Sequence, residues 1–78
     1  MHILVVEDEK KVASFIQRGL EGEGFTVDVA NDGESGVELG SKNNYDLILM
    51  DVMLPKMDGL EAVRALRAKD VSSPVLCL

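Results

Sequence analysis

The sequence has few of the features that mark a secreted or membrane protein. It contains a single cysteine, Cys77, so no disulfide bond can form within the chain, and a lone thiol in an apolar run is typical of a reducing compartment. We expect Cys77 to be a buried strand residue rather than a reactive thiol. No apolar run approaches the roughly 20 residues that a membrane-spanning helix needs, and an apolar strand pattern follows His2 where a signal peptide would show its charged and apolar regions. These absences predict a cytoplasmic protein without membrane contact.

Basic residues and low-complexity segments are also scarce. The 78 residues include 14 acidic and 8 basic side chains, which gives a net charge of −6. Because nucleic-acid phosphates require a basic protein face, we expect no direct binding of DNA or RNA by this segment. The chain shows no repeats and no linkers. Its length argues for one domain or less, in a size range where folding buries only about 60% of the unfolded surface.

What the sequence does contain is a regular alternation of strand and helix patterns. Short apolar runs predict four strands, at residues 2–6, 25–30, 47–51 and 75–78. The segments between them predict three helices, at residues 9–23, 34–42 and 60–69. Continuous apolar runs are typical of strands that are covered on both faces, and alternating strands and helices favour a parallel sheet with right-handed crossovers. The fold class is therefore predicted to be α/β.

The three helices differ in how clearly the sequence marks them. The first has an apolar face formed by Val12, Phe15, Ile16 and Leu20. Asp8 is well placed to cap its N-terminus. The second is weak, because Gly36 and Gly40 each cost about 1 kcal/mol relative to alanine. In the third, Val63 and Leu66 are expected to face inward.

Two of the predicted strands end in carboxylates. Glu7 and Asp8 follow the first strand, and Asp51 ends the third. In an open parallel sheet, ligands bind outside the carboxyl ends of the strands. If the two strands are neighbours, the carboxylates converge and repel one another by several kcal/mol at an effective dielectric constant of about 20. Either a cation neutralises them or one stays protonated. Mg²⁺ fits best, because it is a hard ion with oxygen ligands, and a main-chain carbonyl just past Asp51 could add another ligand.

An aspartate beside such a cation has a specific chemical use. Carboxylates form covalent phosphoryl intermediates, and phosphoryl transfer needs mainly positioning and neutralisation of the transferred oxygens. The residues therefore predict phosphoryl acceptance at Asp51. Each acid also has an ordinary structural explanation: Asp8 as a helix cap, Asp51 as a polar strand end, and Glu7 and Glu9 as solvated side chains. Their joint placement on two separate apolar strands favours function.

Two stretches resemble the receiver (response-regulator) domain of bacterial two-component systems. They are Ile-Leu-Val-Val-Glu-Asp-Glu at 3–9 and Asp-Leu-Ile-Leu-Met-Asp-Val-Met-Leu-Pro-Lys-Met-Asp-Gly at 46–59. The sequences of these two stretches most resemble those of receivers attached to winged-helix transcription factors. The resemblance implies that Asp51 is the phosphoacceptor, that Glu7 and Asp8 form the metal pocket with Asp8 the more direct ligand, and that the Met53 carbonyl completes the protein ligands of Mg²⁺. It also implies a sensor histidine kinase as phosphoryl donor.

The resemblance further implies a flavodoxin-like doubly wound sheet of which residues 1–78 form only a part. The family fold has five strand–helix units in the order 2-1-3-4-5, so strand order 2-1-3-4 is expected here. The hydroxyl residue after the fourth strand, the fifth strand with its lysine and switch aromatic, and the last two helices would lie outside the chain. We therefore expect impaired switching, and contact with DNA only through a missing output domain. We also expect self-association, as a homodimer or strand-exchanged oligomer, at the apolar edge around 75–78.

Two other classes of function stay open on the residues alone. A Mg²⁺-dependent phosphohydrolase with an aspartyl nucleophile would usually carry a second acid two residues later, where this chain has Met53, so we expect no enzyme. The other class is a receiver-like interaction module that works by dimerising without phosphorylation. Covalent modification would separate these classes.

Four basic residues are expected to form a solvated face. They are Lys56, Arg64, Arg67 and Lys69.

Overall fold

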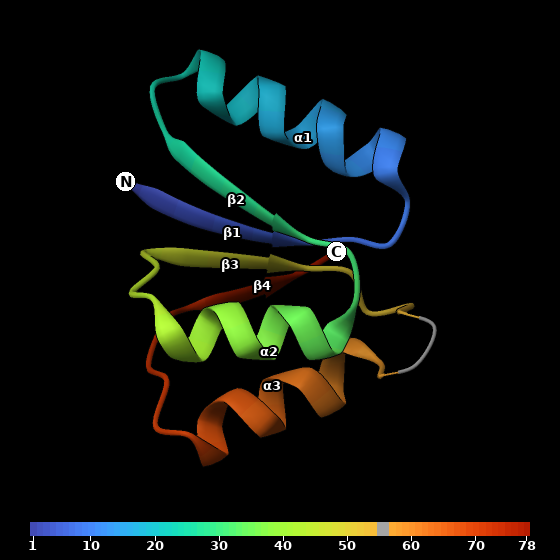
Figure 1. Ribbon diagram of the computed structural model, residues 1–78, viewed down its shortest axis with the longest axis vertical. Helices are drawn as coiled ribbons and strands as arrows, with labels where there is room; N and C mark the ends of the chain where they lie inside the picture. Colours follow the sequence, from blue (N-terminus) through green and yellow to red (C-terminus); the bar gives the residue numbers. More distant parts are fainter. Residues whose placement is uncertain (55–56) are drawn as a thin grey trace.

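The computed structural model describes residues 1–54 and 57–78 and shows an open parallel sheet with helices on both faces (Figure 1). Within these residues, strands alternate with helices along the chain. The strands are β1 (His2–Val6), β2 (Thr26–Ala30), β3 (Leu47–Met50) and β4 (Val75–Cys77). The helices are α1 (Lys10–Gly22), α2 (Gly33–Lys42) and α3 (Gly59–Ala68). The predicted elements are all present, with ends that shift by one residue or so.

The strands lie in the order β2-β1-β3-β4, and every neighbouring pair is parallel. At the carboxyl end of β1, Val6 pairs with Ala30 of β2 on one side and with Met50 of β3 on the other. The chain thus leaves β1 first toward one edge of the sheet and later toward the other. The α/β class, the flavodoxin-like arrangement and the strand order 2-1-3-4 are confirmed, and the switch of direction lies between the ends of β1 and β3.

Alternate residues of the strands build a core on each face of the sheet. Helices α2 and α3 cover one face and α1 covers the other (Figure 1). The larger core lies under α2 and α3 and includes Leu4, Val6, Ile48, Met50 and Leu66, all essentially buried. The smaller core lies under α1 and is formed by Ile3, Val5 and Val27 with half-buried neighbours such as Ile16 and Leu20. Residues of β1 therefore contribute to both cores.

Several expectations about single residues were wrong. Helix α1 begins after Glu9, whose side chain makes no cap hydrogen bond, so Asp8 is not the cap. Ala13 is the buried residue of α1, whereas Phe15 is 74% exposed. In α3, Ala62 is buried together with Leu66, and Val63 is only half-buried.

Cys77 is exposed as well, contrary to the prediction of a buried strand residue. It lies on β4, which forms one edge of the sheet. Leu76 and Leu78 beside it are also exposed. The apolar run of 75–78 therefore has the composition of an interior strand but the surroundings of an edge strand, which explains why its burial could not be judged from its residues.

The glycines of α2 lie where the helix approaches its neighbours most closely. A Cβ atom on Gly36 would lie 2.8 Å from Val6 Cγ2, and one on Gly40 would lie 2.8 Å from Leu66 Cδ2. At the start of the helix, Asp32 accepts a hydrogen bond of 2.7 Å from the Ser35 amide. The glycines that weaken this helix in isolation therefore allow it to pack against β1 and α3.

Replacing Gly36 with alanine is expected to destabilise the protein by up to about 2 kcal/mol. Overpacking costs about 1–3 kcal/mol, and the gain in helix propensity of about 1 kcal/mol offsets only part of it. Gly19 of α1 is the matched control, because a Cβ there would meet no atom within 4 Å, so Gly19→Ala should stabilise the fold. Urea denaturation of the three proteins measures both effects, and a Gly36→Ala variant as stable as Gly19→Ala would contradict this packing.

A polar network of His2, Asp28 and Tyr45 connects the strands near the amino end of β1. Glu7 and Asp8 follow the opposite end of that strand. Asp28 Oδ2 accepts a hydrogen bond of 2.7 Å from the Tyr45 hydroxyl and lies 2.9 Å from His2 Nε2. The His2 and Tyr45 rings are in contact, with centroids 4.6 Å apart. These contacts give His2 a structural environment shared by β1, β2 and the segment before β3.

The stability of the fold should fall at high pH because of Tyr45. Burial raises the pKa of Tyr45 to about 12 from 10.0, and the neighbouring Asp28 adds to the effect. The folded state thus holds the phenol proton more tightly than the unfolded chain does. This contribution is complete below pH 10 and is lost as pH rises to about 12, a change of about 2–3 kcal/mol. Urea denaturation between these pH values should show a smaller loss for Tyr45→Phe than for the parent chain, and equal losses would contradict the assignment.

Candidate functional site

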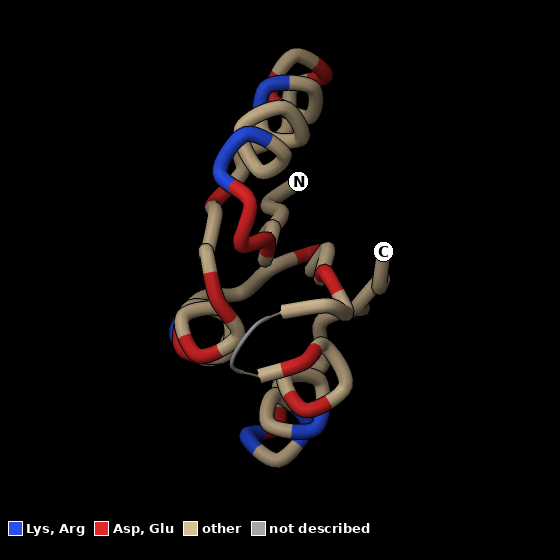
Figure 2. Tube along the Cα trace, turned by 90° about the vertical axis from the view of Figure 1, so that its right-hand side faces the viewer, with Lys and Arg blue, Asp and Glu red and all other residues tan. Residues whose placement is uncertain are grey.

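Three carboxylates meet at the edge of the sheet where the strands end. Glu7 and Asp8 follow β1, and Asp51 follows β3. One oxygen from each side chain lies within 4.8 Å of the others. Figure 2 views the molecule from this edge, where acidic segments gather beyond the strands, and the basic segments lie mostly on the helices. The topology thus brings together residues that are more than forty positions apart in the chain.

The main chain fixes where two of these side chains begin. The Glu7 amide donates a hydrogen bond of 3.0 Å to the Ala30 carbonyl, and the Asp51 amide donates one of 3.0 Å to the Val6 carbonyl. Both bonds continue the parallel ladders one residue beyond the regular strands. The positions of Glu7 and Asp51 are therefore set by the sheet rather than by a loose loop.

Glu7 is the buried member of the group. Its Oε2 atom accepts a hydrogen bond of 2.9 Å from the Glu9 amide, and its carbonyl accepts one of 3.3 Å from the Asn31 side chain. Burial raises the pKa of Glu7 above its ordinary value, the Glu9 amide opposes that rise, and the neighbouring Asp8 and Asp51 increase it. Negative charge is therefore in excess at this point of the molecule.

Asp51 is half-buried and has a defined orientation. Its Oδ1 atom accepts a hydrogen bond of 2.9 Å from the Met53 amide, and no other donor bonds to this carboxylate in the described part of the chain. The Met53 side chain is 81% exposed. The proposed role of the Met53 carbonyl as a metal ligand stays a prediction.

The segment after Asp51 is supported by residues whose part the sequence did not reveal. The side chain of Asp58 caps α3 by accepting a hydrogen bond of 2.9 Å from the Glu61 amide. A Cβ atom on Gly59 would lie 2.8 Å from the Val52 Cα and 3.1 Å from the Asp51 carbonyl oxygen. Asp58 and Gly59 therefore form the start of α3, placed directly against the segment that carries Asp51.

The donor set suits a hard divalent cation. In residues 1–54 and 57–78, no lysine or arginine forms an ion pair with the three acids. A cation held by carboxylate oxygens would relieve their mutual repulsion, and Mg²⁺ takes oxygen ligands of this kind while keeping several waters. Pro55 and Lys56 lie outside the described residues, so the expected solvated position of Lys56 stays a prediction. The other predicted basic residues, Arg64, Arg67 and Lys69, are exposed as expected.

Comparison with known proteins gives a clear relationship over almost the whole chain. Residues 3–78 match the family described as response regulator receiver domain. The uncharacterized transcriptional regulatory protein YkoG of Bacillus subtilis is 46% identical over 77 residues, which cover 99% of this chain and 34% of that protein. The chain thus spans about a third of the length of the curated relatives it matches.

Two solved structures share the fold and hold Mg²⁺. The receiver domain of the sensor histidine kinase PA1611 from Pseudomonas aeruginosa, with a magnesium ion coordinated in its active site cleft, is 35% identical with a TM-score of 0.92 and covers 97% of this chain and 64% of its own. The response regulator TrrA from Thermotoga maritima, in complex with Mg²⁺ and BeF, is 32% identical with a TM-score of 0.88 and covers 95% and 64%. Sequence, fold and acidic motifs agree, and the chain belongs to the response regulator receiver domain family.

Proposed function

We propose that this chain is the phosphoacceptor module of a two-component signalling system. Asp51 takes a phosphoryl group from a phosphohistidine of a sensor histidine kinase, and Mg²⁺ is held by Glu7, Asp8, Asp51 and the Met53 carbonyl. The observation that carries the proposal is the meeting of three carboxylates within 4.8 Å at the ends of β1 and β3. The Mg²⁺ in the active site cleft of the PA1611 receiver domain supports the choice of metal.

In this proposal the residues have separate tasks. A carboxylate oxygen of Asp51 attacks the phosphorus atom, an O–P bond forms, the P–N bond to the imidazole breaks, and the ring leaves with that electron pair. The Met53 amide donates a hydrogen bond to Oδ1 of Asp51 and so restrains the orientation of this carboxylate. Bound Mg²⁺ would supply the neutralisation of the transferred oxygens. Glu7, fixed by the sheet, and Asp8 beside it provide the ligands that place the ion.

This arrangement supports signalling rather than catalytic turnover. A phosphohydrolase needs an acid or base next to its nucleophile to activate water. Two residues after Asp51 the chain offers Met53, whose exposed apolar side chain cannot serve. Family members such as YkoG are described as transcriptional regulatory proteins. We therefore propose that any effect on DNA comes through a segment beyond this chain. The alternative function is dimerisation without phosphorylation, which would leave Asp51 unmodified.

Beryllofluoride, a mimic of the phosphoryl group, tests the proposed site without requiring a cognate kinase. Addition of Mg²⁺ and beryllofluoride to the ¹⁵N-labelled chain should shift the amide signals of Asp51, Met53 and Gly59. The Asp51→Asn variant should show no such shifts, because the mimic binds to a carboxylate. Shifts of equal size in the parent and in Asp51→Asn would show that the ligand binds elsewhere and would reject the proposed site.

We also propose that the 78-residue chain self-associates through β4. The strand forms an edge of the sheet, and Leu76 and Leu78 are exposed on it. Exposed apolar edges recruit other strands, either by pairing or by strand exchange between copies. Light scattering should report a dimer or larger species at high concentration, and Leu76→Lys should shift the population to monomer. A strictly monomeric, folded parent chain would contradict this proposal.

A further inference from the structure

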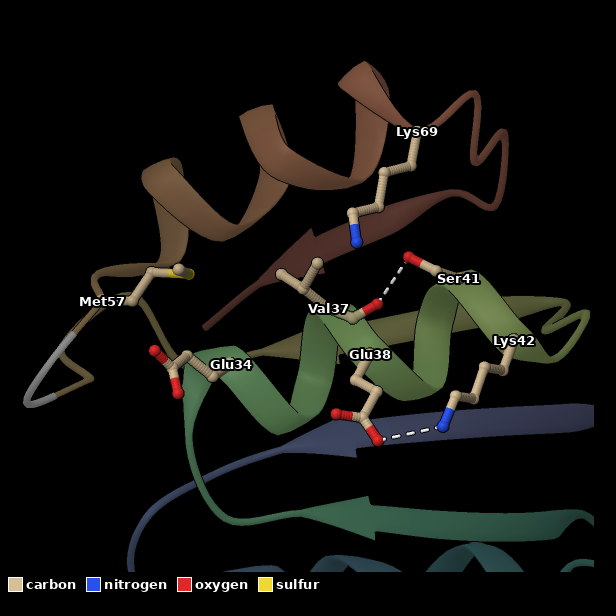
Figure 3. A pocket seen from close by; sticks show the side chains of 7 residues that line it. All are labelled: Glu34, Val37, Glu38, Ser41, Lys42, Met57 and Lys69. Atoms are coloured by element: carbon tan, nitrogen blue, oxygen red, sulfur yellow. Dashed lines mark hydrogen bonds and ion pairs between the residues drawn. The ribbon is translucent and has the colours of Figure 1, made fainter.

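A groove lies between α2 and α3, and its lining includes none of the three carboxylates Glu7, Asp8 and Asp51 (Figure 3). Its volume is about 420 Å³, within the range of sites that hold small ligands or short peptide segments. Most of its walls come from one side of α2, with one residue from the segment before α3 and one from the end of α3. The lining residues are Glu34, Val37, Glu38, Ser41, Lys42, Met57 and Lys69.

The middle of the groove is apolar. Val37 of α2 is buried beneath it, and the half-buried Met57 borders it at the end that also carries Glu34. A methionine side chain is unbranched and flexible, so it can adapt to apolar groups of different shape. This part of the groove therefore suits an aliphatic side chain.

The charged groups around this apolar middle are of two kinds. Glu38 and Lys42 form an ion pair of 3.1 Å with each other along α2. Glu34 and Lys69 form no ion pair or side-chain hydrogen bond with any residue of the described ranges. Figure 3 shows the Lys69 ammonium directed into the groove toward Ser41, and Glu34 near Met57 at the other end. The groove thus offers one cation and one anion at opposite ends.

The spacing of these two ends can be judged from the helix. Glu34 and Ser41 are seven residues apart on α2, which corresponds to about 10 Å along the helix axis. In an extended peptide, residues i, i+2 and i+4 point to one face, and the first and last of them are about 13 Å apart. Flexible charged side chains at i and i+4 can reach both ends of the groove while an aliphatic residue at i+2 enters its middle.

From this charge complementarity we propose that the groove binds a short extended peptide segment of a partner protein. An acidic side chain of the segment pairs with Lys69, a basic side chain two positions beyond the central aliphatic residue pairs with Glu34, and the aliphatic residue contacts Val37 and Met57. Because both ion pairs are exposed to solvent, they contribute more to the selection of the segment than to tight binding.

The probe is the blocked peptide acetyl-Glu-Ser-Leu-Ser-Arg-amide, titrated into the ¹⁵N-labelled 78-residue chain and followed by NMR. Blocked ends remove the terminal charges. We expect saturable shifts of the Val37, Ser41 and Met57 amides. The analogue with glutamine at both charged positions should bind about tenfold more weakly, and high salt should weaken the charged peptide alone.

Variants of the groove separate the proposed contacts from general charge effects. Glu34→Gln and Lys69→Gln should each weaken binding of the charged peptide about threefold, as expected for exposed ion pairs. Glu61→Gln and Arg64→Gln carry the same changes of charge on α3 outside the groove and should leave binding unchanged. Equal affinity for the neutral analogue, equal effects of the control variants, or no shift in the groove at about 10 mM peptide would each overturn the proposal.

Discussion

Replacing Asp8 with asparagine is expected to weaken Mg²⁺ binding about a hundredfold, which is about 2.7 kcal/mol, and to stabilise the metal-free fold. The structural reason is the same for both effects. Asp8 is one of three carboxylates whose oxygens lie within 4.8 Å of one another, so its charge attracts a cation and repels its neighbours. Asp8 is exposed, and solvent reduces the repulsion, so the gain in metal-free stability should be about 1 kcal/mol or less.

The same substitution distinguishes a metal ligand from a solvated side chain without a part in metal binding. An Asp8 side chain of the second kind would leave Mg²⁺ affinity unchanged when replaced with asparagine. Calorimetric titration with Mg²⁺ and urea denaturation with and without the ion measure the two effects. Glu21→Gln removes the same charge at the far end of α1 and should not alter Mg²⁺ affinity. An Asp8→Asn variant that binds Mg²⁺ within twofold of the parent chain would remove Asp8 from the proposed ligands.

Replacing Gly59 with alanine should both destabilise the fold and slow phosphorylation of Asp51. The added Cβ would lie 2.8 Å from the Val52 Cα and 3.1 Å from the Asp51 carbonyl oxygen. These are main-chain atoms, so no side-chain rotation can relieve the contact, and α3 or the segment that carries Asp51 must move. We expect a loss of about 2–3 kcal/mol in stability. Because displacements of about 1 Å at a reacting group cost up to a hundredfold in rate, phosphorylation by acetyl phosphate should slow at least tenfold.

Gly19→Ala is the control for this prediction, because a Cβ on Gly19 meets no atom within 4 Å. It should leave the phosphorylation rate unchanged. Stability is measured by urea denaturation and the rate by mass spectrometry over time. A Gly59→Ala variant with the stability and rate of the parent chain would show that the contact between α3 and the Asp51 segment tolerates an added methyl group.

The arrangement of the acidic site could be predicted because it depends on simple patterns. Apolar runs locate β1 and β3, and the residue that follows each run must lie at the carboxyl edge of a parallel sheet. That logic places Glu7 and Asp51 without knowledge of any side-chain contact. Their convergence needs only that the two strands be neighbours, as the register of β1 with β3 shows.

Other features depend on contacts that no sequence pattern reports. Periodicity identified α1 as amphipathic but not its rotation about its own axis, so Phe15 was expected inside and is exposed, while the smaller Ala13 is buried. The contact of Gly59 with Val52 exists only once the main chain is folded. Likewise, only the structure places Asp28 between His2 and Tyr45.

The most direct test of the central claim is the intact mass of the chain after incubation with acetyl phosphate and Mg²⁺. We predict that one phosphoryl group is added to the parent chain. We predict no addition when a chelator removes Mg²⁺ from the reaction, and no addition to Asp51→Asn. Circular dichroism of the same samples confirms that each is folded. A folded parent chain that gains no phosphoryl group, or an Asp51→Asn variant that gains one, would contradict the assignment of Asp51 as the phosphoacceptor.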